Sequence, residues 1–361
     1  MPALGHEKPQ RDVVDVQVAI VGAGPIGLEL AVVLKHMGVD AVHFDAGQVA
    51  QTISWYPRQA RFFSSPERIA IAGVPLTTAD QSKATREAYL AYLRGIVQQF
   101  DLKVNTYERV TAVQRDEAGF TLRTDRRGEP RAYRARHVVL AVGDMHKPRR
   151  LNVPGEDMDH VSHYFDEPHR YFNQRLLIVG GRNSAVEAAL RCHHAGARVS
   201  LAYRRGRFDE KAIKYWLLPE LKSLIKHGKI AFHPNTCVER IAADEVALRD
   251  SQDASASPQT VAADFVLLLT GYEMDTTLFE LAGVELVGEN RSPRFDTATM
   301  QTNVPGLYVA GTAAAGTQVR FKLFIENCHA HASKIAASIT GRQPPMHLVN
   351  QAAKQFGLPE S

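Results

Sequence analysis

The sequence is short of the residues that several kinds of redox and metal site require. It contains three cysteines in 361 residues, Cys192, Cys237 and Cys328, and no C-x-x-C pair. Cysteines this far apart argue against a disulfide framework and a zinc ribbon, and they exclude the simplest redox dithiol. We therefore expect no metal site, and we interpret Cys192 and Cys328 as small buried apolar residues on helices rather than as redox thiols.

Long basic blocks and long apolar runs are also missing. The 43 basic and 39 acidic residues leave a formal charge of +4, and basic residues gather only in pairs such as Arg126-Arg127. This pattern does not indicate nucleic-acid binding. No apolar run approaches the roughly 18 residues that span a bilayer, and the first residues carry no apolar signal segment. We expect a cytoplasmic protein without a membrane or nucleic-acid partner.

The remaining composition is that of an ordinary globular protein. Apolar residues make up 45% and charged residues 23% of the chain, which is typical of a folded soluble protein. At roughly 100 to 200 residues per domain, the length predicts two domains.

A first glycine-rich turn follows an apolar strand and precedes a helix. It reads Gly22-Ala23-Gly24-Pro25-Ile26-Gly27, and Asp45 ends the next predicted strand. In the pattern G-x-G-x-x-G, the glycines permit a tight turn, close approach of a pyrophosphate and close packing of helix and strand. The helix N-terminus favours phosphate, and Asp45 can accept hydrogen bonds from a ribose. The alternative is a glycine turn that only joins strand to helix.

A second turn of the same kind follows a second apolar strand. It reads Gly180-Gly181-Arg182-Asn183-Ser184-Ala185, with arginine in the place that faces the pyrophosphate. A side chain at Arg182 would crowd a dinucleotide in the usual pose, or its guanidinium would pair with a phosphate. Arg204 and Arg205 follow the next strand, where a 2′-phosphate of NADP would be recognised; otherwise they are a solvated basic pair.

The two turns predict an α/β fold with two Rossmann-like dinucleotide-binding domains. The segment "HKPRRLNVPGED" marks a linker. The alternating runs "VTAVQRDEAGFTLRT" and "AYRARHVVLAVG" indicate a small antiparallel meander in the first domain, and we expect one in the second domain as well. By analogy of fold, we assign an FAD-binding domain to residues 1–150 and 275–361. The NAD(P)H-binding domain, residues 151–274, is inserted into it.

Several segments carry a family resemblance. "VVLAVGDMHKPRRLNVPGE" resembles the connector of two-dinucleotide-domain flavoproteins, and "TNVPGLYVAGT" resembles their second FAD segment. "WYP" with "FFSSPE", "IKYWLLPEL", "LTGYEMD" and "FIEN" resemble the thioredoxin-reductase-like bacillithiol disulfide reductases. The resemblance implies FAD, NADPH, reduction of an oxidised low-molecular-weight thiol, and a homodimer. It adds these cofactor-binding candidates: Val110, Ala141, Val142, Gly143, Gly271, Gly311, Thr312 and Lys322.

The sequence departs from the family at two positions. Members commonly carry a cysteine where this chain has Ile26, and they usually carry glycine where it has Arg182. Without the cysteine, electrons would pass from flavin to substrate directly. Thr312 also stands where many members have an aspartate. We leave the catalytic residues unassigned.

Further candidates lie outside the turns. The last helix is predicted to begin near residues 317–322, with its dipole directed at the flavin, and Arg320 and Lys322 would add charge there. Trp55, Tyr56, Phe62 and Phe63 would line a flavin or substrate pocket, or belong to the core. Lys83, Thr85 and Arg86 would contact the cofactor or substrate, or form a capped helix start.

The predicted function is that of an FAD-dependent, NADPH-using oxidoreductase acting on a small disulfide or another small acceptor. One alternative, favoured by Ile26, is a flavin oxidase, monooxygenase or quinone reductase. The other, favoured by Arg182, is a flavin-binding redox sensor with poor turnover.

Overall fold

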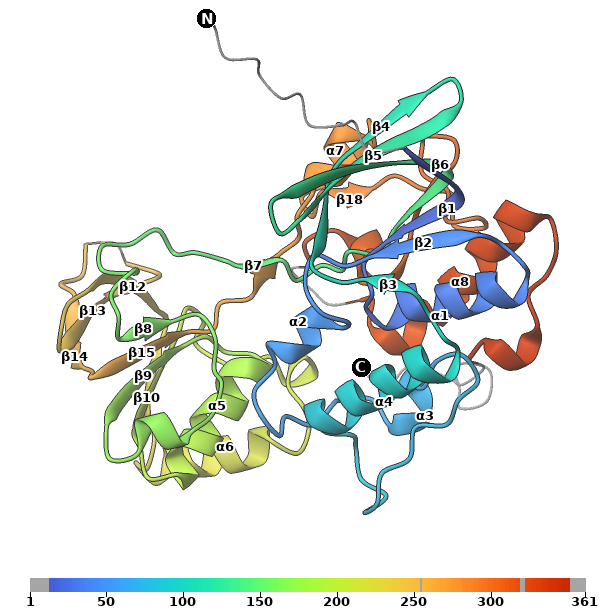
Figure 1. The fold of residues 1–361 in the computed structure, drawn as a ribbon. Coiled ribbons are helices and arrows are strands. Elements are labelled where there is room, and N and C mark those ends of the chain that lie inside the picture. Colours follow the sequence, from blue (N-terminus) through green and yellow to red (C-terminus); the bar gives the residue numbers. More distant parts are fainter. Residues whose placement is uncertain (1–12, 254, 319–321, 351–361) are drawn as a thin grey trace, which may run out of the picture. The chain divides into compact units, whose positions relative to one another are not determined.

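The computed structural model describes residues 13–253, 255–318 and 322–350 of the chain (Figure 1). They divide into two compact units. The outer unit comprises the described parts of residues 1–54, 61–147 and 273–361, and the inner unit comprises those of residues 55–60 and 148–272. The sequence analysis assigned residues 55–60 to the outer part of the chain, whereas their contacts group them with the inner unit.

The outer unit is built on a seven-stranded sheet. Its parallel part has the order β3 (Val104–Asn105), β2 (Ala41–Phe44), β1 (Val14–Val21), β6 (Glu129–Leu140) and β19 (Leu307–Val309). The start of β6 also pairs antiparallel with β5 (Gly119–Arg126), which pairs with β4 (Glu108–Asp116). The long strand β6 therefore belongs to both the parallel sheet and the meander.

Helices pack on this sheet, and α1 (Pro25–His36) is central among them (Figure 1). Residues 26–34 of α1 are all buried, and all of them except Glu29 are apolar or glycine, as expected for a helix enclosed on every side. Pro25 occupies the first turn, and Gly38 ends the helix with a φ of 75°. The other helices are α2 (Gln51–Ser54), α3 (Pro66–Ile69), α4 (Arg86–Gln99), α7 (Thr277–Leu281) and α8 (Ile325–Thr340).

The inner unit repeats the design. Its parallel sheet has the order β11 (Ala231–Pro234), β10 (Arg198–Tyr203), β9 (Arg175–Val179), β15 (Phe265–Leu268) and β8 (Val161–Ser162). Leu176 and Ile178 pack against α5 (Asn183–His194) and α6 (Leu218–Lys226). Leu177 and Val179, on the opposite face, pack against the meander β12 (Thr236–Ile241), β13 (Glu245–Asp250) and β14 (Gln259–Ala262). Cover on both faces explains why these strands are continuously apolar.

The predicted α/β class with Rossmann-like units is confirmed. The predicted start of the last helix is wrong, because α8 begins at Ile325. The side-chain oxygen of Gln318 accepts the amides of Lys322 and Leu323 at 2.8 and 3.0 Å, and Asn327 accepts that of Phe324. These side-chain oxygens accept hydrogen bonds from backbone amides that, in a longer helix, would donate to carbonyls of the helix itself. Arg320 lies outside the described residues.

Residues 55–60 are held by three kinds of contact within the inner unit. The Arg58 amide donates to the carbonyl of Asp166 at 2.9 Å, and its guanidinium pairs with the Asp166 carboxylate at 3.2 Å. Arg191 of α5 donates to the carbonyl of Arg58 at 2.6 Å, and the Trp55 ring packs edge-on against Tyr164.

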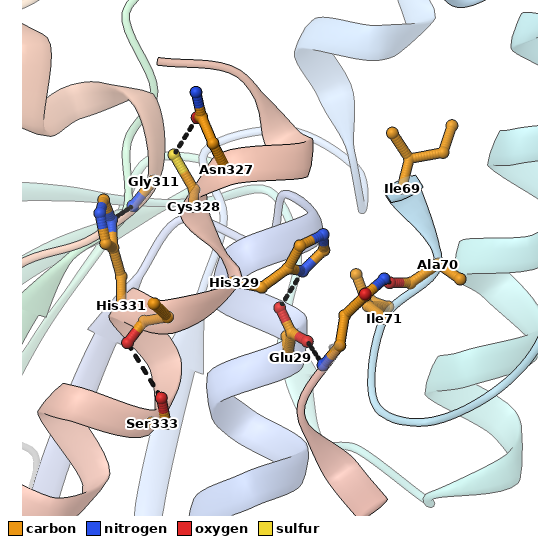
Figure 2. Close-up of polar contacts among 12 residues, drawn as sticks. Glu29, Ile69, Ala70, Ile71, Gly311, Asn327, Cys328, His329, His331 and Ser333 are labelled. Atoms are coloured by element: carbon orange, nitrogen blue, oxygen red, sulfur yellow. Dashed lines mark hydrogen bonds and ion pairs between the residues drawn. The ribbon is translucent and has the colours of Figure 1, made fainter. Parts of the chain in front are cut away.

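A buried ion pair joins α1 to α8 in the outer unit (Figure 2). His329 Nδ1 lies 2.7 Å from the Glu29 carboxylate, and His329 Nε2 lies 2.8 Å from the carbonyl of Arg68. Both ring nitrogens face acceptors, so both donate and the ring is an imidazolium. Burial alone would lower the pKa of His329, but Glu29 and the Arg68 carbonyl outweigh it and raise the pKa. Glu29 is fully buried.

We predict that His329→Leu destabilises the outer unit by about 3 to 5 kcal/mol, because it leaves the Glu29 charge buried without a partner. The folded pKa is raised, so the histidine contributes stability fully below its ordinary pKa of 6.5 and loses it as pH rises through the folded value. Urea unfolding between pH 6 and 9 should therefore show the largest difference between variant and wild type at the acid end.

The matched control is the exposed His227, which contacts only its own helix turn. His227→Gln should leave the pH dependence of stability unchanged. A wild-type stability that rises steadily above pH 6.5 would contradict the assignment of the imidazolium.

Candidate cofactor-binding sites

The first turn needs glycine at two of its three glycine positions for packing alone. A Cβ on Gly22, whose φ is +108°, would lie 2.3 Å from the carbonyl oxygen of Ala141. A Cβ on Gly27 would lie 2.0 Å from the carbonyl oxygen of Gly22. A Cβ on Gly24 would meet no atom within 4 Å, although Gly24 caps the N-terminus of α1. The open space beside a helix N-terminus fits a phosphate group, which needs both close backbone approach and amide donors.

Asp45 connects this turn to the next strand. One carboxylate oxygen accepts the amide of Ala23 at 2.8 Å, and the other accepts the amide of Gly47 at 2.8 Å. Burial raises the pKa of Asp45, and the two amides partly offset that effect. Each oxygen keeps a further lone pair, so Asp45 can also accept a ribose hydroxyl.

The predicted residues of the outer unit gather at one edge of its sheet. Three adjacent parallel strands, β1, β6 and β19, end there, with Val21 opposite Leu140 and Leu140 opposite Val309. The residues that directly follow these strands and β2 are Gly22, Gly24, Pro25, Ile26, Gly27, Asp45, Ala141, Val142, Gly143, Gly311 and Thr312. This carboxyl edge is where open α/β sheets bind ligands.

Two other predicted residues lie apart from that edge. Val110 is buried within β4, whose first residue, Glu108, donates its amide to the carbonyl of Asp45. Lys322 is exposed in the segment before α8 rather than in the helix.

The structure adds polar residues to this edge that the sequence analysis missed. Asp144, four residues after β6, accepts a hydrogen bond from the Gln318 amide at 2.8 Å and is buried. Burial raises the pKa of Asp144, while Gln318 and Thr312 lower it by hydrogen bonding. A charged residue directly after the apolar strand and glycine was a signal for Asp144. No sequence pattern signals Gln318.

A neutral histidine holds the turn after β19 (Figure 2). His331 Nδ1 accepts the Gly311 amide at 3.1 Å, and Gly311 has a φ of 69°. Burial lowers the pKa of His331 to about 4, so the ring stays neutral and Nδ1 stays an acceptor. A Cβ on Gly311 would lie 3.6 Å from Ile26, so this turn also adjoins the first turn.

The second turn, in the inner unit, also has glycine where a side chain would clash, although Ala185 stands in the place of Gly27. A Cβ on Gly180, with φ +147°, would lie 2.5 Å from the carbonyl of Leu269, and one on Gly181 would lie 2.4 Å from the Tyr203 ring. Arg182 occupies the N-cap of α5, as Gly24 does for α1. Backbone at Leu269 therefore excludes a side chain at Gly180, the Tyr203 ring excludes one at Gly181, and the turn accepts one at position 182.

Arg182 interacts with charged groups of both signs. Burial lowers the pKa of Arg182, and Arg205 and Arg204 act in the same direction, while Tyr203 and Asp209 oppose them. Arg204 and Arg205 are exposed directly after β10. Gly271 lies shortly after the end of β15, and Asn183, Ser184 and Ala185 lie shortly after the end of β9. These predicted residues are therefore all at the carboxyl edge of the inner sheet.

A partly buried ion pair fixes the loop beside this turn. The side-chain oxygen of Asn183 accepts the amide of Lys214 at 2.6 Å, and Lys214 Nζ lies 2.8 Å from the Glu187 carboxylate on α5. The loop belongs to the family-like segment "IKYWLLPEL", but no sequence pattern predicts a role for Lys214 or Glu187.

The long segment after β2 has mainly structural contacts. Thr85 caps α4, because its hydroxyl oxygen accepts the amide of Ala88 at 3.2 Å. Arg86 pairs with Glu87 and donates to the carbonyl of Ser54. Lys83 Nζ donates to the carbonyl of Phe63, and the Phe62 ring packs edge-on against Tyr89. The alternative interpretation as a capped helix start fits Thr85 and Arg86.

Two of the three cysteines are buried away from any substrate, whereas Cys237 on β12 is partly exposed. Cys192 and Cys328 are fully buried, and burial raises the pKa of Cys192 to about 12 and that of Cys328 still further. No group of three His, Cys, Asp or Glu residues in the part of the chain that the structure describes could hold a metal ion. Among the described helices, none is long and apolar enough to cross a membrane.

Comparisons with known proteins agree with this construction. The family model described as pyridine nucleotide-disulphide oxidoreductase matches residues 19–311. The chain is 36% identical over 325 residues to bacilliredoxin reductase Bdr of Bacillus subtilis, covering 90% of this chain and 97% of that protein. The bacillithiol disulfide reductase structure from Bacillus cereus is 35% identical, with a TM-score of 0.85, covering 91% of this chain and 100% of that one.

A more distant likeness concerns the fold alone. The thioredoxin reductase structure of T. acidophilum is 20% identical, with a TM-score of 0.69, and covers 90% of this chain and 97% of that one.

The fold and its two glycine turns define a flavoprotein with two dinucleotide-binding units. The chain belongs to the pyridine nucleotide-disulphide oxidoreductase family. It is a flavin-dependent oxidoreductase, and its cofactors are FAD and NADPH, as the sequence analysis predicted.

We predict that Gly24→Ala and Gly27→Ala have opposite profiles. Gly24→Ala should change the free energy of unfolding by no more than about 1 kcal/mol, but weaken FAD binding. Gly27→Ala should cost about 3 kcal/mol or more, because its Cβ overlaps backbone. Urea unfolding of the apoprotein and fluorescence titration with FAD measure the two effects. Equal loss of stability in both variants would contradict this division of roles.

Proposed function

We propose that the chain is an NADPH-dependent reductase of a low-molecular-weight disulfide, such as bacillithiol disulfide, that works without an enzyme thiol. The observation that carries the proposal is the combination of a pyridine-nucleotide turn with two fully buried cysteines and with Ile26 in the first turn. The relatives' names, bacilliredoxin reductase and bacillithiol disulfide reductase, support the substrate class.

The net reaction is balanced by one proton. NADPH and a disulfide RSSR, with one H⁺, give NADP⁺ and two thiols RSH. FAD, when bound, supplies a two-electron carrier between the nicotinamide and the disulfide. No nucleophile is available from Cys192 or Cys328, because burial keeps both thiols protonated. Cys237 is partly exposed, but it lies on β12 of the meander rather than at either glycine turn. The protein's contribution is therefore to bind and orient both cofactors rather than to form a mixed disulfide.

We assign the FAD-holding residues to the carboxyl edge of the outer sheet. The turn at Gly22, Gly24 and Gly27 would take the pyrophosphate at the start of α1. Asp45, already oriented by the amides of Ala23 and Gly47, would accept the adenosine ribose hydroxyls.

We assign NADPH to the carboxyl edge of the inner sheet. Gly180 and Gly181 would bring the backbone close, and Arg182 at the α5 N-cap would pair with the pyrophosphate. Arg204 and Arg205, exposed after β10, would recognise the 2′-phosphate. Arg204 and Arg205 each lower the pKa of Arg182, which Tyr203 and Asp209 oppose, and a bound polyanion would relieve the repulsion among the three arginines. This favours phosphate pairing by Arg182 over obstruction.

The direct test follows the flavin absorbance anaerobically. NADPH should bleach the flavin faster than NADH does, and bacillithiol disulfide should restore the oxidised spectrum with release of two thiols per NADPH. Cys192→Ala, Cys237→Ala and Cys328→Ala, made singly, should each retain this turnover. Flavin that NADPH reduces but that only oxygen or a quinone reoxidises would instead establish the oxidase or quinone reductase alternative.

The arginine variants should differ in how they change the affinities for NADPH and NADH. We predict that Arg204→Ala with Arg205→Ala weakens NADPH binding about tenfold to hundredfold and leaves NADH binding unchanged, since NADH lacks the 2′-phosphate. Arg182→Ala should weaken both coenzymes, because both carry the pyrophosphate. Rapid-reaction titrations with each coenzyme give the dissociation constants. Faster reduction in Arg182→Ala would show that the side chain obstructs the site.

A further inference from the structure

One buried carboxylate in this chain differs from the others in its partners. Among the described residues, five acidic side chains are less than 9% exposed: Glu29, Asp144, Glu108, Glu156 and Glu326. Four of them have a cationic side chain or a histidine within 4 Å, namely His329, Arg131, Arg150 with His163, and Arg68 respectively. Asp144 has none among the residues that the structure describes.

The groups that do contact Asp144 are neutral. Its Oδ2 accepts the Gln318 side-chain amide at 2.8 Å, and the Thr312 hydroxyl acts on it as a second donor. Gln318 is itself fully engaged, since its oxygen accepts two backbone amides and its nitrogen also donates to the carbonyl of Leu323. The Gln318 network therefore holds Asp144 in place without neutralising its charge.

The position of Asp144 identifies what it can meet. It follows β6, and Thr312 follows β19, so both stand beside the first turn at the edge assigned to FAD. A carboxylate without a cation repels phosphate, and it accepts hydrogen bonds only. Thr312, when its proton points to Asp144, also offers only lone pairs. A cluster of acceptors next to a phosphate turn suits a chain of hydroxyl groups.

We propose that Asp144 positions FAD by accepting a hydrogen bond from a hydroxyl of the polyol chain that links the flavin ring to the pyrophosphate. The inference rests on the proposed placement of FAD at this sheet edge. Asp144 is a positioning residue, because it would hold the cofactor without touching the reacting atoms. Removing its charge should lower FAD affinity without changing affinity for ligands that lack the polyol.

The test compares FAD with ADP, which keeps the adenosine and the pyrophosphate but lacks the polyol and the flavin ring. Apoprotein is titrated with each ligand, using flavin fluorescence and calorimetry. Asp144→Asn should weaken FAD binding about tenfold to hundredfold, as expected for a hydrogen bond to a charged group. ADP binding should stay at the wild-type value, which also shows that the variant is folded at this site.

A matched control and a second variant complete the design. Asp116→Asn removes one exposed carboxylate from the meander and should leave both affinities unchanged. Asp144→Ser keeps a hydroxyl in a smaller side chain and should lose FAD affinity selectively, as Asp144→Asn does. Wild-type FAD affinity in the Asp144 variants would overturn the proposal, and so would an equal loss for FAD and ADP. Failure of the wild type itself to take up FAD would instead refute the proposed placement of the cofactor.

Discussion

The outer unit depends on backbone packed against backbone at the first turn. Gly22 lies so close to Ala141, and Gly27 so close to Gly22, that neither tolerates a side chain. This contact brings α1 onto the ends of β1 and β6, and it directs the amides of the helix N-terminus towards open space beside Gly24. Asp45, Gly311 and Asp144 then surround the same edge because their strands are neighbours of β1 and β6. One steric constraint thus positions most of the candidate FAD site.

The inner unit keeps part of this constraint, because Gly180 packs against backbone as Gly22 does, but Ala185 stands where the outer unit has Gly27. Gly180 and Gly181 are excluded from carrying side chains by Leu269 and Tyr203, whereas the N-cap position accepts Arg182. Arg182, in the place where the nucleotide-binding pattern has glycine, is therefore compatible with the backbone of the turn. Its significance is electrostatic, because it adds a third cation beside Arg204 and Arg205.

Much of the fold could be predicted from local sequence patterns. Glycine spacing after apolar strands predicted both turns, and alternation predicted the meander of the outer unit, because strand and turn preferences act over a few residues. Contacts between residues that are distant in the sequence could not be predicted from such patterns. Asp144 and Gln318 are 174 positions apart, and Glu29 and His329 are 300 apart. The start of α8 was misplaced for the same reason, since the Gln318 side chain competes for amides that helix periodicity alone would assign to the helix.

Residues 55–60 change how the chain can be divided. They leave the outer unit after Ser54 and return to it at Arg61, so the polypeptide passes between the two units four times rather than twice. A fragment cut at residues 148 and 272 would lack Arg58, which pairs with the carboxylate of Asp166 and accepts a hydrogen bond from the guanidinium of Arg191. The inner unit therefore cannot be removed as one continuous segment of the chain. Its exchange between relatives would require transplanting a six-residue piece from a distant part of the sequence as well.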